Sequence, residues 1–118
     1  MIHRFKFALR GILIGFIEEV NLKLHYISTV LALGLGIYLG CSSVEISILG
    51  LTATLVLSME YVNTSIERLS NRVSLERHPL IRDTKDLAAG AVLIASIGAA
   101  VVGALILGPK LWILLLNA

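Results

Sequence analysis

Charged residues are scarce in this sequence. Only 15% of its 118 residues are Asp, Glu, Lys or Arg, whereas 57% are hydrophobic, and the mean hydropathy is +0.90. A water-soluble domain of this size has a high surface-to-volume ratio and needs many polar groups to cover its surface. Because the chain has too few polar groups for this, we expect a single domain that is embedded in a lipid membrane.

Other absences narrow the function. The single cysteine, Cys41, excludes a disulfide within the chain. No glycine-rich run is followed by Lys-Ser or Lys-Thr, which excludes a phosphate-binding loop, so the glycines are interpreted as helix-packing positions, with Gly36 and Gly40 as a small-xxx-small pair. The net charge of +2, without a compact basic cluster and interleaved aromatic residues, argues against nucleic acid as a partner.

Long uncharged runs are present instead. Residues 24–44 and 87–109 contain no acid, lysine or arginine, and each run can cross a hydrocarbon core that needs roughly 20 residues of helix. The apolar stretch between them contains Glu60 and Glu67. We predict an all-α membrane protein with an amphipathic surface helix at 1–23 and membrane helices at 24–40, 44–73 and 80–107, the last one ended by Gly108-Pro109.

The basic residues are distributed unevenly along the chain. Of the ten Lys and Arg residues, all but Lys110 lie before the first predicted span or between the second and the third, and the connection at 41–45 has none. By the positive-inside rule, we expect the N-terminus and the 68–86 region in the cytoplasm and the C-terminus on the outer side of the cell membrane.

Three polar residues of the second span lie at helical spacing. Glu60, Asn63 and Glu67 are separated by three and four residues and therefore share a helix face. A carboxylate inside a membrane helix is costly unless it is paired, hydrated or bound to a cation, which makes it a functional candidate. Two carboxylates and an amide suit Mg²⁺. Two structural readings stay open, in which Glu67 is a solvated charge at the helix end and Glu60 is hydrogen-bonded across helices.

The other predicted helices bring charges to the same membrane depth. Glu19 precedes the first span, and Lys85 and Asp86 begin the third. Acids that hold a metal and a lysine that neutralises phosphate are the groups that phosphoryl transfer needs. The alternative is a small proton- or cation-coupled transporter or channel subunit that uses Glu60 and Glu67, although such a protein would place its acids nearer the membrane midplane.

Five blocks of the sequence resemble the prokaryotic diacylglycerol kinase and undecaprenol kinase family, and together they extend over nearly the whole chain. The block EYVNTSIE, followed later by Lys85-Asp86, is the most specific one. The blocks are residues 5–11, 19–25, 60–67, 78–80 and 84–93.

The resemblance implies a homotrimeric lipid kinase with active sites between its subunits. It also implies a transfer of the γ-phosphate of ATP to a lipid hydroxyl at the cytoplasmic side of the membrane. The roles implied by matching positions are Glu60 as general base, Glu19 and Glu67 as Mg²⁺ ligands, and Glu19, Asn63, Glu67, Lys85 and Asp86 as nucleotide-binding residues.

Two positions distinguish this chain within the family it resembles. Asn71 stands where the family usually has an acid, a change at the edge of the implied nucleotide site. With His25, where some members have a carboxylate, the chain resembles the Gram-positive-type branch of the family. This resemblance implies undecaprenol as the preferred substrate and diacylglycerol as the second candidate. A third hypothesis, an inactive homologue that serves as a structural subunit, follows from Asn71, although every residue matched to direct chemistry is present.

Overall fold

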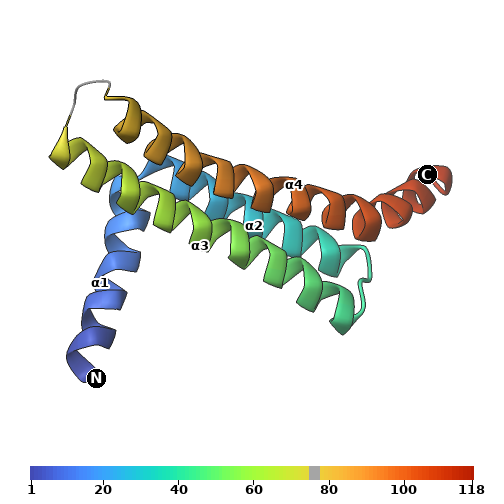
Figure 1. Cartoon of the computed structure of the whole chain (residues 1–118). Helices are drawn as coiled ribbons and strands as arrows, with labels where there is room; N and C mark the ends of the chain where they lie inside the picture. The colour runs from blue at the N-terminus through green and yellow to red at the C-terminus, as the bar shows by residue number, and fades with distance from the viewer. Residues whose placement is uncertain (75–77) are drawn as a thin grey trace.

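All regular structure in the described part of the chain is helical. A computed structural model describes residues 1–74 and 78–118, and it contains four helices in the order α1 (Ile2–Glu18), α2 (Val20–Tyr38), α3 (Ser43–Val73) and α4 (Pro79–Leu116). The prediction of an all-α protein is therefore confirmed (Figure 1). Arg77, which counted in the charge distribution, lies outside the described residues.

Three of the four helices are suited to a membrane. With 19, 31 and 38 residues, α2, α3 and α4 are long and apolar enough to cross a bilayer, as predicted. The fourth, α1, leaves the other three at a steep angle (Figure 1). Its location at the membrane interface and the trimer both stay predictions.

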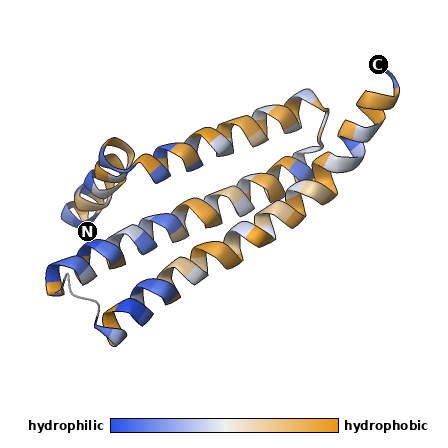
Figure 2. Ribbon diagram, turned by 90° about the horizontal axis from the view of Figure 1, so that it is seen from above, coloured by the Kyte–Doolittle hydropathy of each residue, from blue (hydrophilic) through white to orange (hydrophobic). Residues whose placement is uncertain are grey.

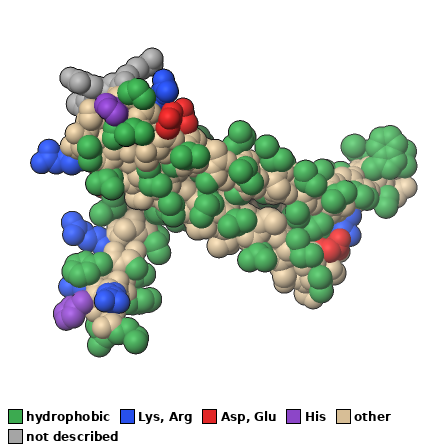
Figure 3. All heavy atoms as spheres, viewed as in Figure 1, with side chains coloured by type: hydrophobic (Ala, Val, Ile, Leu, Met, Phe, Trp, Pro, Cys, Tyr) green, Lys and Arg blue, Asp and Glu red, His purple; other side chains and the backbone are tan. Residues whose placement is uncertain are grey.

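Helix α3 lies between α2 and α4 and packs against both of them. Figure 2 shows hydrophilic residues concentrated where α3 and α4 approach the connection between them, and apolar residues along the rest of these helices. The space-filling view in Figure 3 shows the same separation on one face, with charged side chains toward the ends of the long helices. The start of α2, the end of α3 and the start of α4 therefore lie at the same end of the bundle (Figure 1).

Helix α1 ends earlier than the predicted boundary at residue 23. Glu19 has an extended backbone, with φ −109° and ψ 116°, and it separates α1 from α2. Close to this turn, α1 contacts α3 at the buried Gly15, where a Cβ atom would overlap the ring of Tyr61. The bend places Glu19 at the junction of α1, α2 and α3.

The two glycines expected to pack helices together have different functions. A Cβ atom at Gly36 would lie 3.0 Å from Cδ1 of Ile46, so this glycine does permit the close approach of α2 and α3. Gly40 lies beyond the end of α2 and has a φ of +79°, a left-handed conformation that glycine adopts without steric cost. It therefore serves the turn between the helices.

The end of α4 requires a correction. Gly108-Pro109 was expected to end the helix at residue 107, but α4 continues through Pro109 to Leu116. Membrane helices tolerate proline because other groups can satisfy the freed backbone carbonyl. An ion pair fixes the residues after the proline, with 3.3 Å between Nζ of Lys110 and Oε1 of Glu45. Figure 1 shows the last turns of α4 bending away from the direction of the rest.

The buried core is small. Among the described residues, the buried hydrophobic side chains are Leu22, Leu49, Val56 and Ala88. None of the most apolar stretch of α4 is buried within the chain. Surfaces this apolar and this extensive are not stable in water, which agrees with a protein surrounded by lipid or by further copies of itself.

Candidate active site

Helix α3 carries a buried stripe of polar residues. Glu60 and Asn63 are each only 7% exposed, and Ser70 is 5% exposed. They continue the face on which Leu49 and Val56 are buried, because all five positions recur at spacings close to whole helical turns. Glu60 and Asn63 thus share a face, as their spacing predicts, and the Glu60 side chain is buried among the helices.

An ionisable side chain of α2, that of His25, approaches the Glu60 carboxylate. His25 places its Nε2 atom 3.7 Å from Oε2 of Glu60, a separation that is longer than a hydrogen bond but short enough for an electrostatic contact. The Glu60 side chain is 9% exposed and the His25 side chain 32%. Among the described residues, no side chain is placed within hydrogen-bond distance of the Glu60 carboxylate, and His25 is the polar side chain that approaches it.

One turn further along α3, Asn63 has an unused oxygen. Its Oδ1 atom is buried and has no hydrogen-bond partner among the described residues. A buried amide oxygen left in this way costs about 1–3 kcal/mol. Glu67 lies on the next turn and is exposed, and it forms no ion pair with any residue that the structure describes. The Glu67 carboxylate is thus open to a ligand, whereas the Asn63 oxygen is enclosed in the bundle and lacks a partner in the described part of the chain.

Glu19 is held by an arginine that the sequence did not identify as a site residue. Nη2 and Nε of Arg68 donate to Oε1 of Glu19 at 2.6 and 3.1 Å, and Glu18 lies 3.7 Å from the same guanidinium. This contact joins the α1–α2 junction to α3, so Glu19 does lie beside the helix that carries Glu60. The arginine neutralises one of the acids expected to bind metal.

Lys85 reaches from α4 to α3. Its Nζ atom donates a hydrogen bond to Oδ1 of Asn71. Asn71 thus supplies an acceptor oxygen to the lysine. Asp86 faces a different surface, a shallow groove of about 620 Å³ that is formed by α4 alone and also lined by Asp83. Within one chain, Lys85 therefore contacts α3, whereas Asp86 lines a groove to which Glu60 does not contribute.

The donor atoms fit a magnesium ion in type. In the described ranges, no three His, Cys, Asp or Glu side chains converge closely enough to hold a metal by themselves. Mg²⁺ usually binds one or two carboxylates and completes its octahedron with water and substrate phosphates. The free carboxylate of Glu67 and the unpartnered oxygen of Asn63 are ligands of this kind.

Fold and site together define a class: a small helical membrane protein with buried and exposed acids gathered near one end of its spans. Comparison with known proteins makes the class specific. The sequence profile of the family described as prokaryotic diacylglycerol kinase matches residues 6–107. The chain therefore belongs to the prokaryotic diacylglycerol kinase family, and it is a bacterial membrane kinase that phosphorylates a lipid alcohol.

Individual relatives agree with the family. A diacylglycerol kinase of Synechocystis is 33% identical over 91% of this chain, and the chain spans 62% of that relative's length. An undecaprenol kinase of Bacillus subtilis is 34% identical over 91% of the chain and 87% of its own length. A diacylglycerol kinase of Pseudomonas aeruginosa is 32% identical over 75% of the chain and 72% of its own length. These matches favour a kinase over the transporter or channel subunit.

Proposed function

We propose that this protein transfers the γ-phosphate of ATP to the hydroxyl of a membrane lipid, with undecaprenol as the favoured acceptor and diacylglycerol second. The observation that carries the proposal is the burial of Glu60 without a hydrogen-bond partner among the residues that the structure describes. His25 and the high coverage of the B. subtilis undecaprenol kinase support the choice of lipid. Diacylglycerol remains the second candidate because the chain has a similar sequence identity to a diacylglycerol kinase.

Glu60 acts as the general base in this proposal. Its carboxylate accepts the proton of the lipid hydroxyl as the hydroxyl oxygen attacks the γ-phosphorus. A new O–P bond forms to the lipid, the bond between the γ-phosphorus and the β–γ bridging oxygen breaks, and ADP leaves with that oxygen. The proton then passes from Glu60 to water. A buried carboxylate suits this step because a lipid hydroxyl cannot travel far from the hydrocarbon.

The remaining acids and the lysine serve the nucleotide. Glu19, Glu67 and Asn63 would hold Mg²⁺, which when bound neutralises charge on the transferring phosphate. Lys85 and Asp86 would contact ATP, with Asn71 orienting the lysine through the hydrogen bond described above. Arg68 balances the charge of Glu19, so a metal ion at Glu19 would compete with this arginine.

The proposed assembly is a homotrimer with the site at the cytoplasmic membrane surface. A Cβ atom added at Gly90, Gly98 or Gly103 of α4 would meet nothing within 4 Å inside the chain, so this helix offers small-residue surface to a neighbouring helix. A site shared between subunits would also allow Asp86, on the outer surface of α4, to serve a neighbouring chain. The charge distribution supports a cytoplasmic N-terminus.

The test is a phosphorylation assay with both lipids. Purified protein in bilayers receives ATP, Mg²⁺ and either undecaprenol or diacylglycerol, and we expect labelled phosphate to appear in both lipids, faster in undecaprenol. A reversed preference would reject the substrate order. If neither lipid is phosphorylated while an active lipid kinase works in the same bilayers, the chain is an inactive homologue and the proposal fails.

A further inference from the structure

His25 adjoins both the buried carboxylate of Glu60 and a groove on the surface of the bundle. Its Nε2 atom is 3.7 Å from Oε2 of Glu60. His25 also lines a groove of about 350 Å³ that is formed by residues of α2, α3 and α4.

The groove is narrow and mostly apolar. Its walls consist mainly of alanines, together with Ser28 and Thr29 of α2 and Ser96 of α4. The hydroxyls of Ser28 and Thr29 already donate at 2.8 Å to the carbonyls of Leu24 and His25 within their own helix. The imidazole of His25 is instead directed across to another helix, so it is the polar group that connects this groove to Glu60.

The contact also answers an energetic need. A carboxylate that is nine-tenths buried is stable only when other groups interact with it. Among the described residues, His25 is the charged or hydrogen-bonding side chain that the structure places within 4.0 Å of the Glu60 carboxylate. Contacts of this kind are often long in the absence of substrate and shorten when the reacting complex forms.

We propose that His25 is the positioning residue for Glu60. Donation from Nε2 to Oε2 fixes the rotation of the Glu60 carboxylate, which leaves the other oxygen, Oε1, directed at the acceptor hydroxyl. His25 itself takes no proton from the lipid. The proposal rests on the proposed role of Glu60, and it adds that α2 supplies the residue that makes a flexible glutamate reactive.

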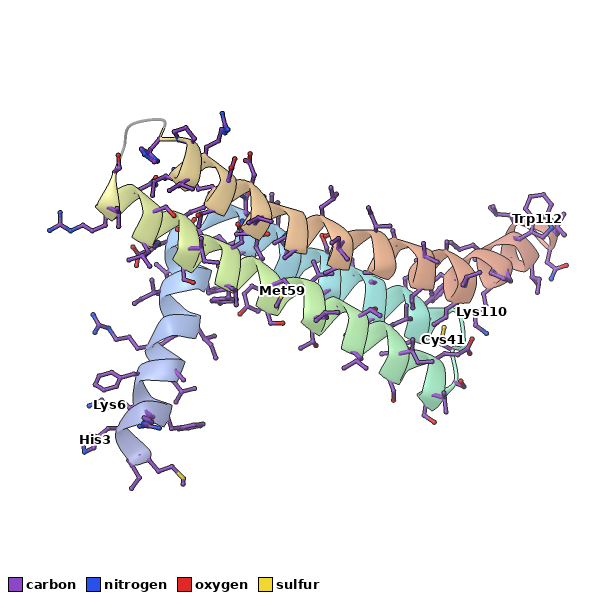
Figure 4. The ribbon with its side chains drawn as sticks, viewed as in Figure 1. His3, Lys6, Cys41, Met59, Lys110 and Trp112 are labelled. Carbon is purple, nitrogen blue, oxygen red and sulfur yellow. The ribbon has the colours of Figure 1, made fainter. Side chains whose placement is uncertain are left out.

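The test compares two substitutions at His25 with one at a remote histidine. His25→Ala removes the donor, and His25→Gln keeps an N–H donor on a side chain of similar reach. His3→Ala is the matched control, because His3 lies exposed near the start of α1, far from the bundle (Figure 4). The kcat and the KM for Mg-ATP are measured for each variant in bilayers.

We expect His25→Ala to lower kcat about tenfold, because a base that is no longer oriented loses part of its 10²- to 10⁴-fold contribution. The KM for Mg-ATP should stay within about twofold of the original protein, since nucleotide binding does not use this contact. His25→Gln should recover a clear part of the lost kcat, and His3→Ala should match the original protein. An unchanged kcat in His25→Ala, or no recovery in His25→Gln, would overturn the proposal.

A thermal-unfolding cycle makes the result independent of catalysis. The shift in unfolding temperature caused by His25→Ala is measured in the original protein and again in a Glu60→Gln background. If the two side chains interact, the shifts differ, whereas equal shifts mean that no coupling exists and the proposal is wrong. A protein that phosphorylates neither lipid would reject the proposed function, and this cycle would still decide whether His25 holds Glu60.

Discussion

Glu45 and Glu60 lie on the same helix, but their surroundings differ. Near the start of α3, Glu45 accepts a hydrogen bond at 2.9 Å from the backbone N–H of Ser42 and forms an ion pair at 3.3 Å with Lys110 of α4. Figure 4 shows Lys110 beside Cys41, at the end of the bundle where α2 turns into α3. Near the middle of α3, Glu60 is buried, and the one ion-pair contact it has among the described residues is the 3.7 Å approach of His25.

The difference is the one expected between a structural carboxylate, Glu45, and the proposed general base, Glu60. Glu45 forms a capping box with Ser42, and this satisfies backbone groups at the start of α3 while Lys110 compensates its charge. A carboxylate engaged in this way has little left to offer a substrate. Glu60 is kept in the apolar interior without comparable partners, a costly arrangement that proteins retain mainly where a site needs it.

The largest expected effect on activity comes from a comparison in which Glu60 and Glu45 are each replaced by glutamine in separate variants. Glu60→Gln should lower the rate of lipid phosphorylation by about 100-fold or more, because an amide cannot accept the proton of the hydroxyl. Glu45→Gln should stay within about twofold of the original rate, since Glu45 lies far from the reacting groups. Initial rates with undecaprenol measure both. Equal losses in the two variants would remove the distinction between the two carboxylates of α3.

A smaller effect is expected at the carboxylates assigned to the metal. Glu19→Gln and Glu67→Gln should each raise the Mg²⁺ concentration needed for half-maximal activity by about tenfold, because each substitution removes a charged ligand. Glu18→Gln is the matched control, since Glu18 lies next to Glu19 and only 3.7 Å from the same arginine. Magnesium titrations at saturating ATP give the comparison. An equal shift in Glu18→Gln would show a general effect of local charge.

The smallest effect should appear at the cap of α3. Ser42→Ala removes the side-chain acceptor for the N–H of Glu45 and should lower the free energy of unfolding by about 1 kcal/mol. The kcat should not change, because the cap lies at the end of α3 remote from Glu60. Ser43→Ala, one residue later and without a capping bond, is the control. Denaturation in detergent measures the stability, and a loss of kcat in folded Ser42→Ala protein would link the cap to the candidate active site.

The sequence predicted the helical class, the three spans and the shared face of Glu60 and Asn63. These features depend on uncharged run length and on helical spacing, which are local properties of the chain. The positions of Glu19 and Lys85 next to the ends of the predicted spans also made them candidates for the same site.

The cross-helix pairs could not be predicted in the same way. The contacts of Arg68 with Glu19 and of His25 with Glu60 join residues far apart in the chain, and periodicity does not tell which helices become neighbours. The continuation of α4 past Pro109 likewise depends on lipid-like surroundings and on a partner for Lys110 in another helix. His25 carried a signal, since it is an ionisable residue in an apolar span, but its partner followed only from the packing.

Nucleotide binding by folded Glu60→Gln protein tests the division of the acids most directly. Equilibrium binding of Mg-ATP is measured in the same bilayers used for turnover, beside the original protein. If Glu60 is the base and not a ligand, the variant binds Mg-ATP with a Kd within about threefold of the original while its turnover is lost. Complete loss of Mg-ATP binding in the folded variant would contradict the account and make Glu60 part of the metal or nucleotide site.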